Sequence, residues 1–129
     1  MAVMIAPTTH RDFRLLAWAE AMTLVEVVYR DTAGFPKEET YGLVSQIRHA
    51  AVSVPSNIAE GAARNSSREW VQFLGITCGS LAELDTQLEL AIRLGFLKAD
   101  APAVNQMHRV GRLVRLLRKS LKIRSDEKK

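Results

Sequence analysis

The sequence predicts an all-α protein, an up-down-up-down bundle of four helices. Apolar residues recur at alternating steps of three and four along four long segments, which places them on one face of each helix. Only four Pro and seven Gly occur in 129 residues, too few for the frequent turns of an all-β fold. The connections between the segments are short, so consecutive helices should pack as antiparallel neighbours. We expect a single domain over residues 1–129, with residues 1–11 and 123–129 flexible.

The first helix is predicted to run from about Asp12 to Thr32, with Asp12 as its N-cap. Gly34 should supply the C-cap, and Pro36 cannot continue the helix. Steps of three and four define the face that we expect to be buried. This predicted face consists of Leu15, Trp18, Met22, Val25 and Tyr29.

The second helix is predicted to begin near Lys37, with Glu38 and Glu39 in its first turn, where carboxylates favour the positive end of the helix dipole. Pro55 lies inside this segment and removes one backbone hydrogen bond. We expect a continuous helix kinked at Pro55, because the apolar spacing runs through the proline. The alternative is a break, with a new helix capped by Asn57. The predicted buried stripe consists of Val44, Ile47, Ala51, Val54 and Ile58.

The third helix has the most regular pattern in the chain. Ser66 and Glu69 have the spacing of a capping box at its start, and Gly95 should end it. Its apolar residues follow heptad spacing, which is typical of a bundle seam. This seam consists of Trp70, Leu74, Thr77, Leu81, Leu84, Leu88 and Ala91.

The last helix should follow a connection in which Asp100 or Ala101 acts as the cap and Pro102 occupies the first turn. We expect it to end near Lys122. Its apolar residues fall in an arc about 120° wide, at 100° per residue. That arc consists of Met107, Val110, Leu113, Val114, Leu117 and Leu121.

Basic residues are concentrated in the same segment. The net charge is +4, but residues 1–97 hold 8 basic and 11 acidic residues, whereas residues 98–129 hold 10 basic and 3 acidic ones. No acidic residue occurs between Val104 and Ser125, although a solvated helix face usually mixes charges of both signs. Leu116 and Ile123 form a second apolar strip beside the basic one. The candidate nucleic-acid-binding residues are Arg109, Arg112, Arg115, Arg118, Lys119, Lys122 and Arg124.

Several classes of chemistry find no support in the sequence. One cysteine, Cys78, cannot form an internal disulfide, and no run approaches the ~18 apolar residues of a membrane span. The three histidines lie on separate segments without a ligand-type residue three or four positions away, and no Gly-rich phosphate loop occurs. We therefore expect a cytoplasmic protein with no membrane partner, no metal, no cofactor and no catalytic residues. Cys78 should behave as a small apolar residue, with Gly79 and Ser80 allowing close approach of another helix.

Two polar groups lie on the second and third helices. If they face each other, they should form a hydrogen-bonded network that fixes the register of the two helices. The alternative is an acid–base site centred on Glu60, Arg64 and Glu83, which lacks the other side chains that catalysis would need. The network residues are Ser53, Asn57, Glu60, Arg64, Ser80, Glu83 and Gln87.

The chain resembles a known family over about Phe13 to Leu121. Its most specific motif is Pro55-Ser56-Asn57-Ile58-Ala59-Glu60-Gly61. Further matches are Phe13, Leu15, Trp18, Ala21, Tyr29, Phe35-Pro36, Glu39, Tyr41-Gly42-Leu43, Gln46-Ile47-Arg48, Ala50 to Val54, Arg64, Glu69, Phe73-Leu74, Gly79 to Leu84, Gln87-Leu88, Ala91 and Leu94-Gly95. With these residues the chain is similar to the 23S ribosomal-RNA intervening-sequence proteins.

The resemblance implies a four-helix bundle that assembles as a ring-shaped homopentamer, and it carries over no catalytic residues. A similar bundle is the accessory protein of diversity-generating retroelements, where a basic pentamer is thought to engage nucleic acid and a reverse transcriptase. Two functional hypotheses follow. The first is a non-catalytic homo-oligomer that binds RNA or DNA phosphates through the last helix, and the second is a scaffold that docks an acidic or reverse-transcriptase-like protein.

Overall fold

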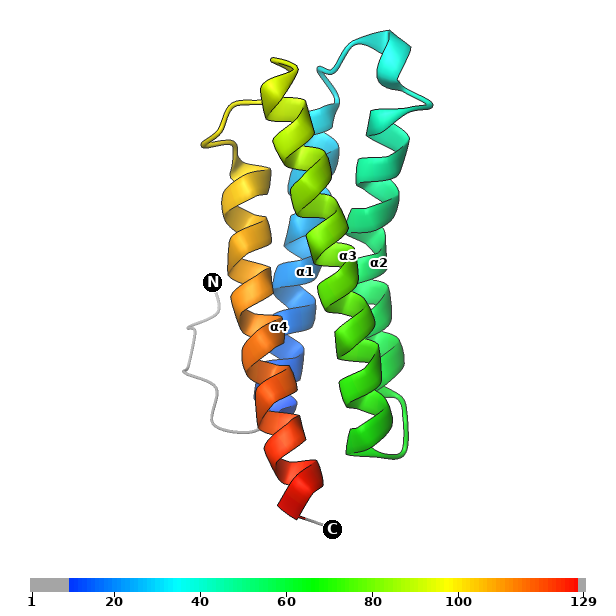
Figure 1. Cartoon of the computed structure of the whole chain (residues 1–129), viewed down its shortest axis with the longest axis vertical. Helices are drawn as coiled ribbons and strands as arrows, with labels where there is room; N and C mark the ends of the chain where they lie inside the picture. The colour runs from blue at the N-terminus through cyan, green and yellow to red at the C-terminus, as the bar shows by residue number, and fades with distance from the viewer. Residues whose placement is uncertain (1–9, 128–129) are drawn as a thin grey trace.

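A computed structural model describes residues 10–127 and shows four long helices in an antiparallel bundle (Figure 1). Across these residues there is no strand, and the predicted all-α fold is confirmed. The elements in chain order are α1 (His10–Thr32), the short 3-10 helix η1 (Lys37–Glu39), α2 (Leu43–Ala62), α3 (Ser67–Arg93) and α4 (Pro102–Glu127). Helix α4 therefore continues past the predicted end near Lys122. Of the termini expected to be flexible, residues 1–9 and 128–129 lie outside the described residues.

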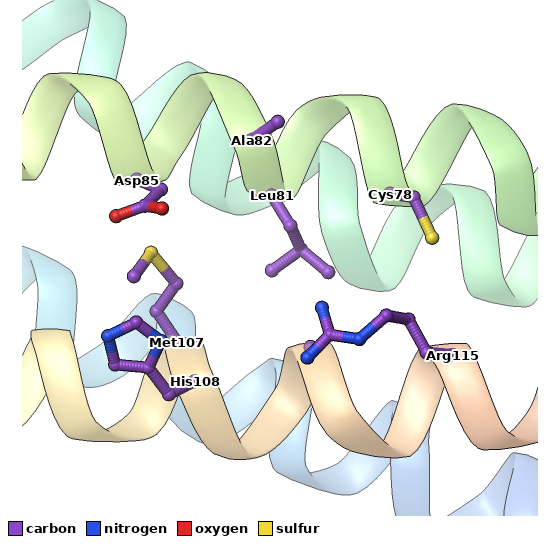
Figure 2. Close-up of a pocket in the computed structure, with 8 residues that line it drawn as sticks. Cys78, Leu81, Ala82, Asp85, Met107, His108 and Arg115 are labelled. Carbon is purple, nitrogen blue, oxygen red and sulfur yellow. The ribbon is translucent and has the colours of Figure 1, made fainter.

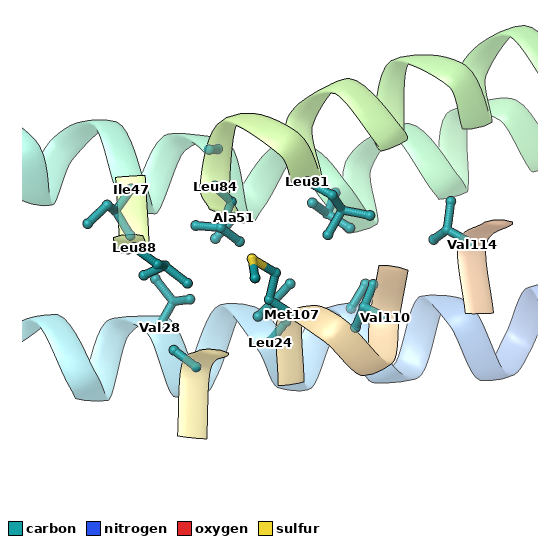
Figure 3. Packing of buried hydrophobic residues seen from close by; sticks show 14 of the residues in the cluster. Leu24, Val28, Ile47, Ala51, Leu81, Leu84, Leu88, Met107, Val110 and Val114 are labelled. Carbon is teal, nitrogen blue, oxygen red and sulfur yellow. The ribbon is translucent and has the colours of Figure 1, made fainter. Parts of the chain in front are cut away.

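The four helices occupy the corners of a square. Helix α1 packs against α2 and α4, and α3 packs against the same two helices. The predicted apolar stripes of α2, α3 and α4 fill the space between them, with Trp70 and Leu113 only partly buried (Figure 3). Each helix hides one face in this way, so its opposite face is directed to the outside.

The predicted buried face of α1 is wrong. Leu15, Trp18, Met22 and Tyr29 are 51, 42, 42 and 43% exposed, and only Val25 is partly buried against the core. The buried residues are instead Ala17, Ala21, Leu24 and Val28. Several of these precede a predicted residue by one position, which corresponds to a rotation of about 100° around the helix axis. Two apolar stripes lie side by side on α1, and the stripe with two alanines is the one that packs inside.

The start of α2 also differs from the prediction. Residues Lys37–Glu39 form a separate 3-10 turn, and the α-helix begins only at Leu43. The Glu39 carboxylate still serves the helix N-terminus, because its Oε2 accepts a hydrogen bond from the Leu43 N–H at 3.2 Å. Helix α2 then runs unbroken through Pro55 to Ala62, so the predicted continuous helix is confirmed and the bend itself stays a prediction.

The caps of α3 follow the sequence prediction. The Ser66 hydroxyl accepts a hydrogen bond from the Glu69 N–H at 3.1 Å, and Gly95 adopts a left-handed φ of 79°.

The start of α4 is capped from another part of the chain. As predicted, Pro102 occupies its first position. The side-chain acceptor, however, is Asp31 at the end of α1, whose Oδ2 accepts a hydrogen bond from the Ala103 N–H at 2.9 Å. Ala101 does occupy the N-cap position that the sequence favoured, because its carbonyl accepts hydrogen bonds from the Val104 and Asn105 N–H groups, and the bundle brings the Asp31 carboxylate to the same point.

Helices α2 and α3 pack closely at Gly61. A methyl group on Gly61 would lie 2.7 Å from both the Phe73 Cβ and the Trp70 Cδ1, inside van der Waals contact. The glycine expected to permit close approach, Gly79, has no neighbour within 4 Å of such a position, so that expectation was wrong. The end of the Pro55–Gly61 motif is therefore a packing requirement between two helices.

We expect Gly61→Ala to lower the free energy of unfolding by about 1–3 kcal/mol, because Phe73 Cβ cannot move without shifting the α3 backbone. Gly79→Ala, at an exposed position of α3, is the matched control. It should raise the free energy of unfolding by up to about 1 kcal/mol, because alanine has a higher helix propensity than glycine. Chemical denaturation followed by circular dichroism measures both. Equal stabilisation by the two substitutions would refute the close contact at Gly61.

Candidate nucleic-acid interface

The structure divides the seven basic residues of α4 into two groups. Arg112, Arg115, Lys119, Lys122 and Arg124 are exposed, with Arg124 on a different side of the helix from the other four, and we call these five the α4 basic row. Among the side chains that the structure describes, none of the five has a carboxylate partner. Five unpaired cations on one exposed helix produce a positive potential that attracts polyanions.

The other two residues are engaged within the bundle. Arg109 forms an ion pair with Glu20 of α1, with 3.0 Å between its Nη2 and the carboxylate Oε1. Arg118 donates from Nε to the Val71 carbonyl at 3.4 Å, and its guanidinium lies over Gly75. Both side chains are partly buried, so their charges stabilise contacts of α4 with its neighbours.

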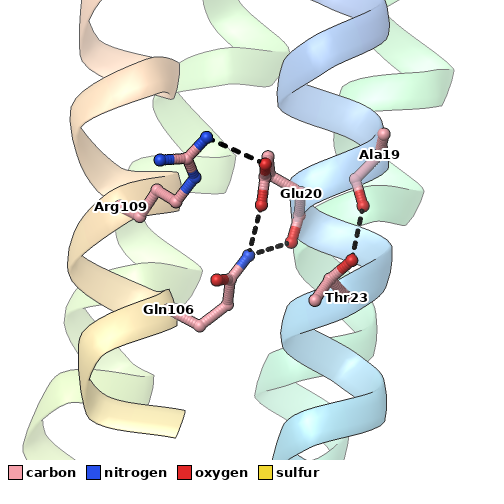
Figure 4. Close-up of polar contacts among 5 residues, drawn as sticks. All are labelled: Ala19, Glu20, Thr23, Gln106 and Arg109. Atoms are coloured by element: carbon pink, nitrogen blue, oxygen red, sulfur yellow. Dashed lines mark hydrogen bonds and ion pairs between the residues drawn. The ribbon is translucent and has the colours of Figure 1, made fainter. Parts of the chain in front are cut away.

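The Arg109 contact belongs to a polar cluster between α1 and α4 (Figure 4). Gln106 Nε2 donates to the Glu20 Oε2 at 2.7 Å and to the Glu20 backbone carbonyl at 2.9 Å. Burial alone raises the pKa of the Glu20 carboxyl, but the hydrogen bonds from Gln106 and Arg109 and the charge of Arg109 outweigh it, and the pKa lies below its ordinary value. The ionised carboxylate is therefore the form that holds α1 to α4.

A hollow of about 210 Å³ separates α3 from α4 beside the basic row. Figure 2 shows the Arg115 side chain lying across this hollow beneath Leu81, with Asp85 and His108 on its facing sides. Cys78 lines its other end as a free thiol. Among the described residues, no hydrogen bond links this thiol to the His108 imidazole.

The two polar groups on α2 and α3 form bonds along their own helices. Asn57 Nδ2 donates to the Ser53 carbonyl at 2.8 Å, and Arg64 pairs with Glu60 at 3.1 Å. On α3, Gln87 Nε2 donates to Glu83 Oε1 at 3.2 Å. Ser53 donates to the Ala50 carbonyl at 2.6 Å, and Ser80 is partly buried. Within residues 14–124, where side chains are described, no hydrogen bond joins the two groups, so they are two local clusters.

The chain is similar to known proteins in sequence and in fold. The sequence matches the family described as 23S rRNA-intervening sequence protein over residues 14–118, most of the chain. The chain belongs to the 23S rRNA-intervening sequence protein family. A search of curated proteins gives no significant match. Among solved structures it is similar to a protein of unknown function from the S23 ribosomal protein family of Bacteroides thetaiotaomicron. The two share 18% identity and a TM-score of 0.74, over 83% of this chain and 98% of that one, a likeness in fold.

A second exposed surface, on α1, was not predicted from the sequence. The large apolar side chains that α1 exposes, namely Leu15, Trp18, Met22 and Tyr29, form what we call the α1 apolar strip. Leu15 and Trp18 border a hollow of about 300 Å³ that Ile58 and Ala59 of α2 complete. The spacing correctly placed these residues on one face of α1, but that face is exposed and not part of the core. In the described part of the chain, no helix is long and apolar enough to cross a bilayer.

We expect Glu20→Ala to lower the free energy of unfolding by about 1–2 kcal/mol at pH 7, because it removes two charge-assisted contacts and leaves Arg109 without its partner. Since the folded pKa of Glu20 is depressed, this stabilisation is fully present above the ordinary carboxyl pKa and is lost as the pH falls through the folded value.

Denaturation at pH 7 and at pH 3 measures this difference. Glu26→Ala, on the exposed face of the same helix, is the matched control and should change stability little. A difference between Glu20→Ala and the wild type that is as large at pH 3 as at pH 7 would contradict the role of the ionised carboxylate.

Proposed function

We propose that this 23S rRNA-intervening sequence protein is a non-catalytic, homo-oligomeric bundle that binds RNA or DNA phosphates through the α4 basic row. The observation that carries the proposal is the exposure of Arg112, Arg115, Lys119, Lys122 and Arg124 on one helix, with no ion pair to any described carboxylate. Lys and Arg that neutralise phosphates release counterions, which makes binding strong at low salt and insensitive to base sequence. Arg109 and Arg118 contribute indirectly, because they fix the side of α4 that faces out.

Self-association through the α1 apolar strip supports this function. Four large apolar side chains on one exposed helix face are typical of a protein–protein contact. The strip lies on α1 beside α2, whereas the basic row lies on α4, so assembly through one leaves the other free. We propose a ring, with five subunits as the number that the family resemblance implies. Repetition of a weak phosphate-binding surface around a ring raises overall affinity through avidity.

The second candidate function is a scaffold for another protein, such as an acidic or reverse-transcriptase-like partner. Leu116 and Ile123 favour it, because both are more than half exposed on α4 beside Arg112 and Lys119. Protein interfaces commonly combine apolar anchors with arginine. Pull-down after nuclease digestion separates the two functions, since a protein partner would be retained and a nucleic-acid bridge would be lost.

We expect the triple variant Arg112→Ala, Lys119→Ala, Lys122→Ala to bind duplex nucleic acid more weakly than the wild type. Because each lost phosphate contact removes about 0.9 from the salt slope, the slope of log affinity against log salt should shrink by about 2–3. Filter binding between 50 and 200 mM salt, roughly the range over which such contacts lose most of their affinity, measures it.

The matched control removes the same charge at the other end of the bundle, through Arg30→Ala, Lys37→Ala and Lys98→Ala, three exposed residues. It should leave the slope almost unchanged. If the wild type retains neither RNA nor DNA at low salt, nucleic-acid binding is excluded, and if both triple variants lose affinity equally, the effect is one of net charge and not of the α4 basic row.

Disruption of the α1 apolar strip should dissociate the oligomer. We expect light scattering of the wild type at micromolar concentration to give about five times the 14.4 kDa chain mass, and Trp18→Glu with Met22→Glu to give the mass of one chain. Ala19→Glu, on the exposed face of α1 outside the strip, is the control and should keep the wild-type mass. A single-chain mass for the wild type would rule out the assembly.

A further inference from the structure

The lower end of the bundle in Figure 1 contains a second basic feature, apart from the exposed face of α4. Helix α2 ends there, α3 begins there, and the last turns of α4 reach the same point. Between them lies a hollow of about 410 Å³, which we call the end pocket. Its lining consists of Ala62, Arg64, Asn65, Ser66, Ser67, Arg68, Trp70, Leu121 and Arg124.

Three guanidinium groups from three segments surround the end pocket, and among residues 14–124, whose side chains are described, no carboxylate lines it. Arg64 is held in place, because it pairs with Glu60 at 3.1 Å and its guanidinium lies 4.7 Å from the centre of the Phe73 ring. Arg68 and Arg124 are exposed and have no hydrogen-bond or ion-pair partner among the described side chains. The pocket therefore has one anchored cation, partly neutralised by Glu60, and two cations without a partner in the described part of the chain.

The backbone adds further donors at this position. Ser67 and Arg68 open α3, so their N–H groups have no acceptor within the helix, and the 27-residue helix directs its positive end toward the pocket. Guanidinium groups match phosphate oxygens with paired, parallel hydrogen bonds. Guanidiniums together with free N–H groups are selective for a compact, multiply charged oxyanion.

The size and the wall of the end pocket limit its ligand further. A volume of about 410 Å³ exceeds the needs of a single phosphate and falls within the range of small-ligand sites. The Trp70 indole and Leu121 give it an apolar wall on one side. The pocket therefore accommodates a phosphate together with an attached sugar or base.

We infer that the end pocket binds one phosphate group of a nucleotide unit and serves as a fixed anchor for the strand that the α4 basic row attracts. That the ligand belongs to a nucleic-acid strand rests on the proposed function. That the pocket binds phosphate rests on Arg64, Arg68 and Arg124. Arg124 connects the two features, because it follows the exposed cations of α4 in sequence but lies on the side of the helix that lines the pocket. The phosphate comes from one of two sources, the 5′ end of a strand or an internal phosphodiester.

The first experiment uses inorganic pyrophosphate and the fluorescence of Trp70. In a Trp18→Phe background Trp70 is the single tryptophan, and phenylalanine keeps an aromatic side chain on the α1 apolar strip. We expect pyrophosphate to change the Trp70 emission, and Arg68→Ala with Arg124→Ala to weaken this binding at least tenfold. Arg112→Ala with Lys119→Ala, an equal loss of charge outside the pocket, should change it less than threefold.

Sodium chloride at matched ionic strength is the control for non-specific screening. If millimolar pyrophosphate has no more effect than chloride, or if both double variants lose binding equally, the end pocket is not a phosphate site and the inference fails.

The second experiment compares two 12-nucleotide strands of one sequence that differ only in a 5′ phosphate. Tighter binding of the phosphorylated strand by fivefold or more, lost in Arg68→Ala with Arg124→Ala, assigns the pocket to a strand end. Equal binding of both strands, weakened alike by that variant, assigns it to an internal phosphodiester. If both strands bind the Arg68→Ala, Arg124→Ala variant as tightly as the wild type, the end pocket is not an anchor for the strand. If pyrophosphate binds but neither strand does, the proposed function is refuted, whereas the end pocket remains a phosphate-binding site.

Discussion

The orientation of α4 is the constraint on which the surface of this protein depends. Its six inward positions, from Ala103 to Leu121, are buried in the core, and this burial fixes which side of the helix faces water. Two polar contacts hold the same orientation from the flanks. Arg109 reaches α1 through Glu20, and Arg118 reaches the α3 backbone at Val71. Arg112, Lys119 and Lys122 are therefore directed away from the bundle, and rotation of α4 by one residue would bury some of its cations at a high free-energy cost.

Helix α1 shows how two apolar stripes on one helix are used. The inner stripe includes Ala17 and Ala21, and the small side chains let the helix lie close to α2 and α4. The larger side chains, including Trp18 and Met22, remain outside on the side nearest α2. Close packing favours the small stripe in a tight bundle, because large side chains at the same positions would force the helices apart. The α1 apolar strip is then left available for a second chain, while the α4 basic row stays accessible.

The packing at the lower end of the bundle has a different physical origin. Gly61 lets α2 and α3 converge against Phe73 and Trp70, and the connection that follows turns within a few residues into the Ser66 cap. This tight return places Arg64 and Arg68 on the same rim. Because α4 ends at that rim, Arg124 joins them, and three cations separated by up to sixty residues of sequence converge on one hollow. Packing at one glycine and one cap thus determines a charged surface several residues away.

By itself, the sequence determined the helical class, the number of helices, the Ser66 and Gly95 caps and the buried stripes of α2, α3 and α4, because each depends on spacing within one segment. It also determined that the last helix is basic and has no acidic residue between Val104 and Ser125. Only the tertiary structure decided which of two adjacent stripes of α1 is inside, that Asp31 caps α4, and that Arg109 and Arg118 are engaged by the bundle. It alone brought Arg64, Arg68 and Arg124 together. These features depend on distances between helices, and periodicity within one helix contains no information about what its neighbour presents.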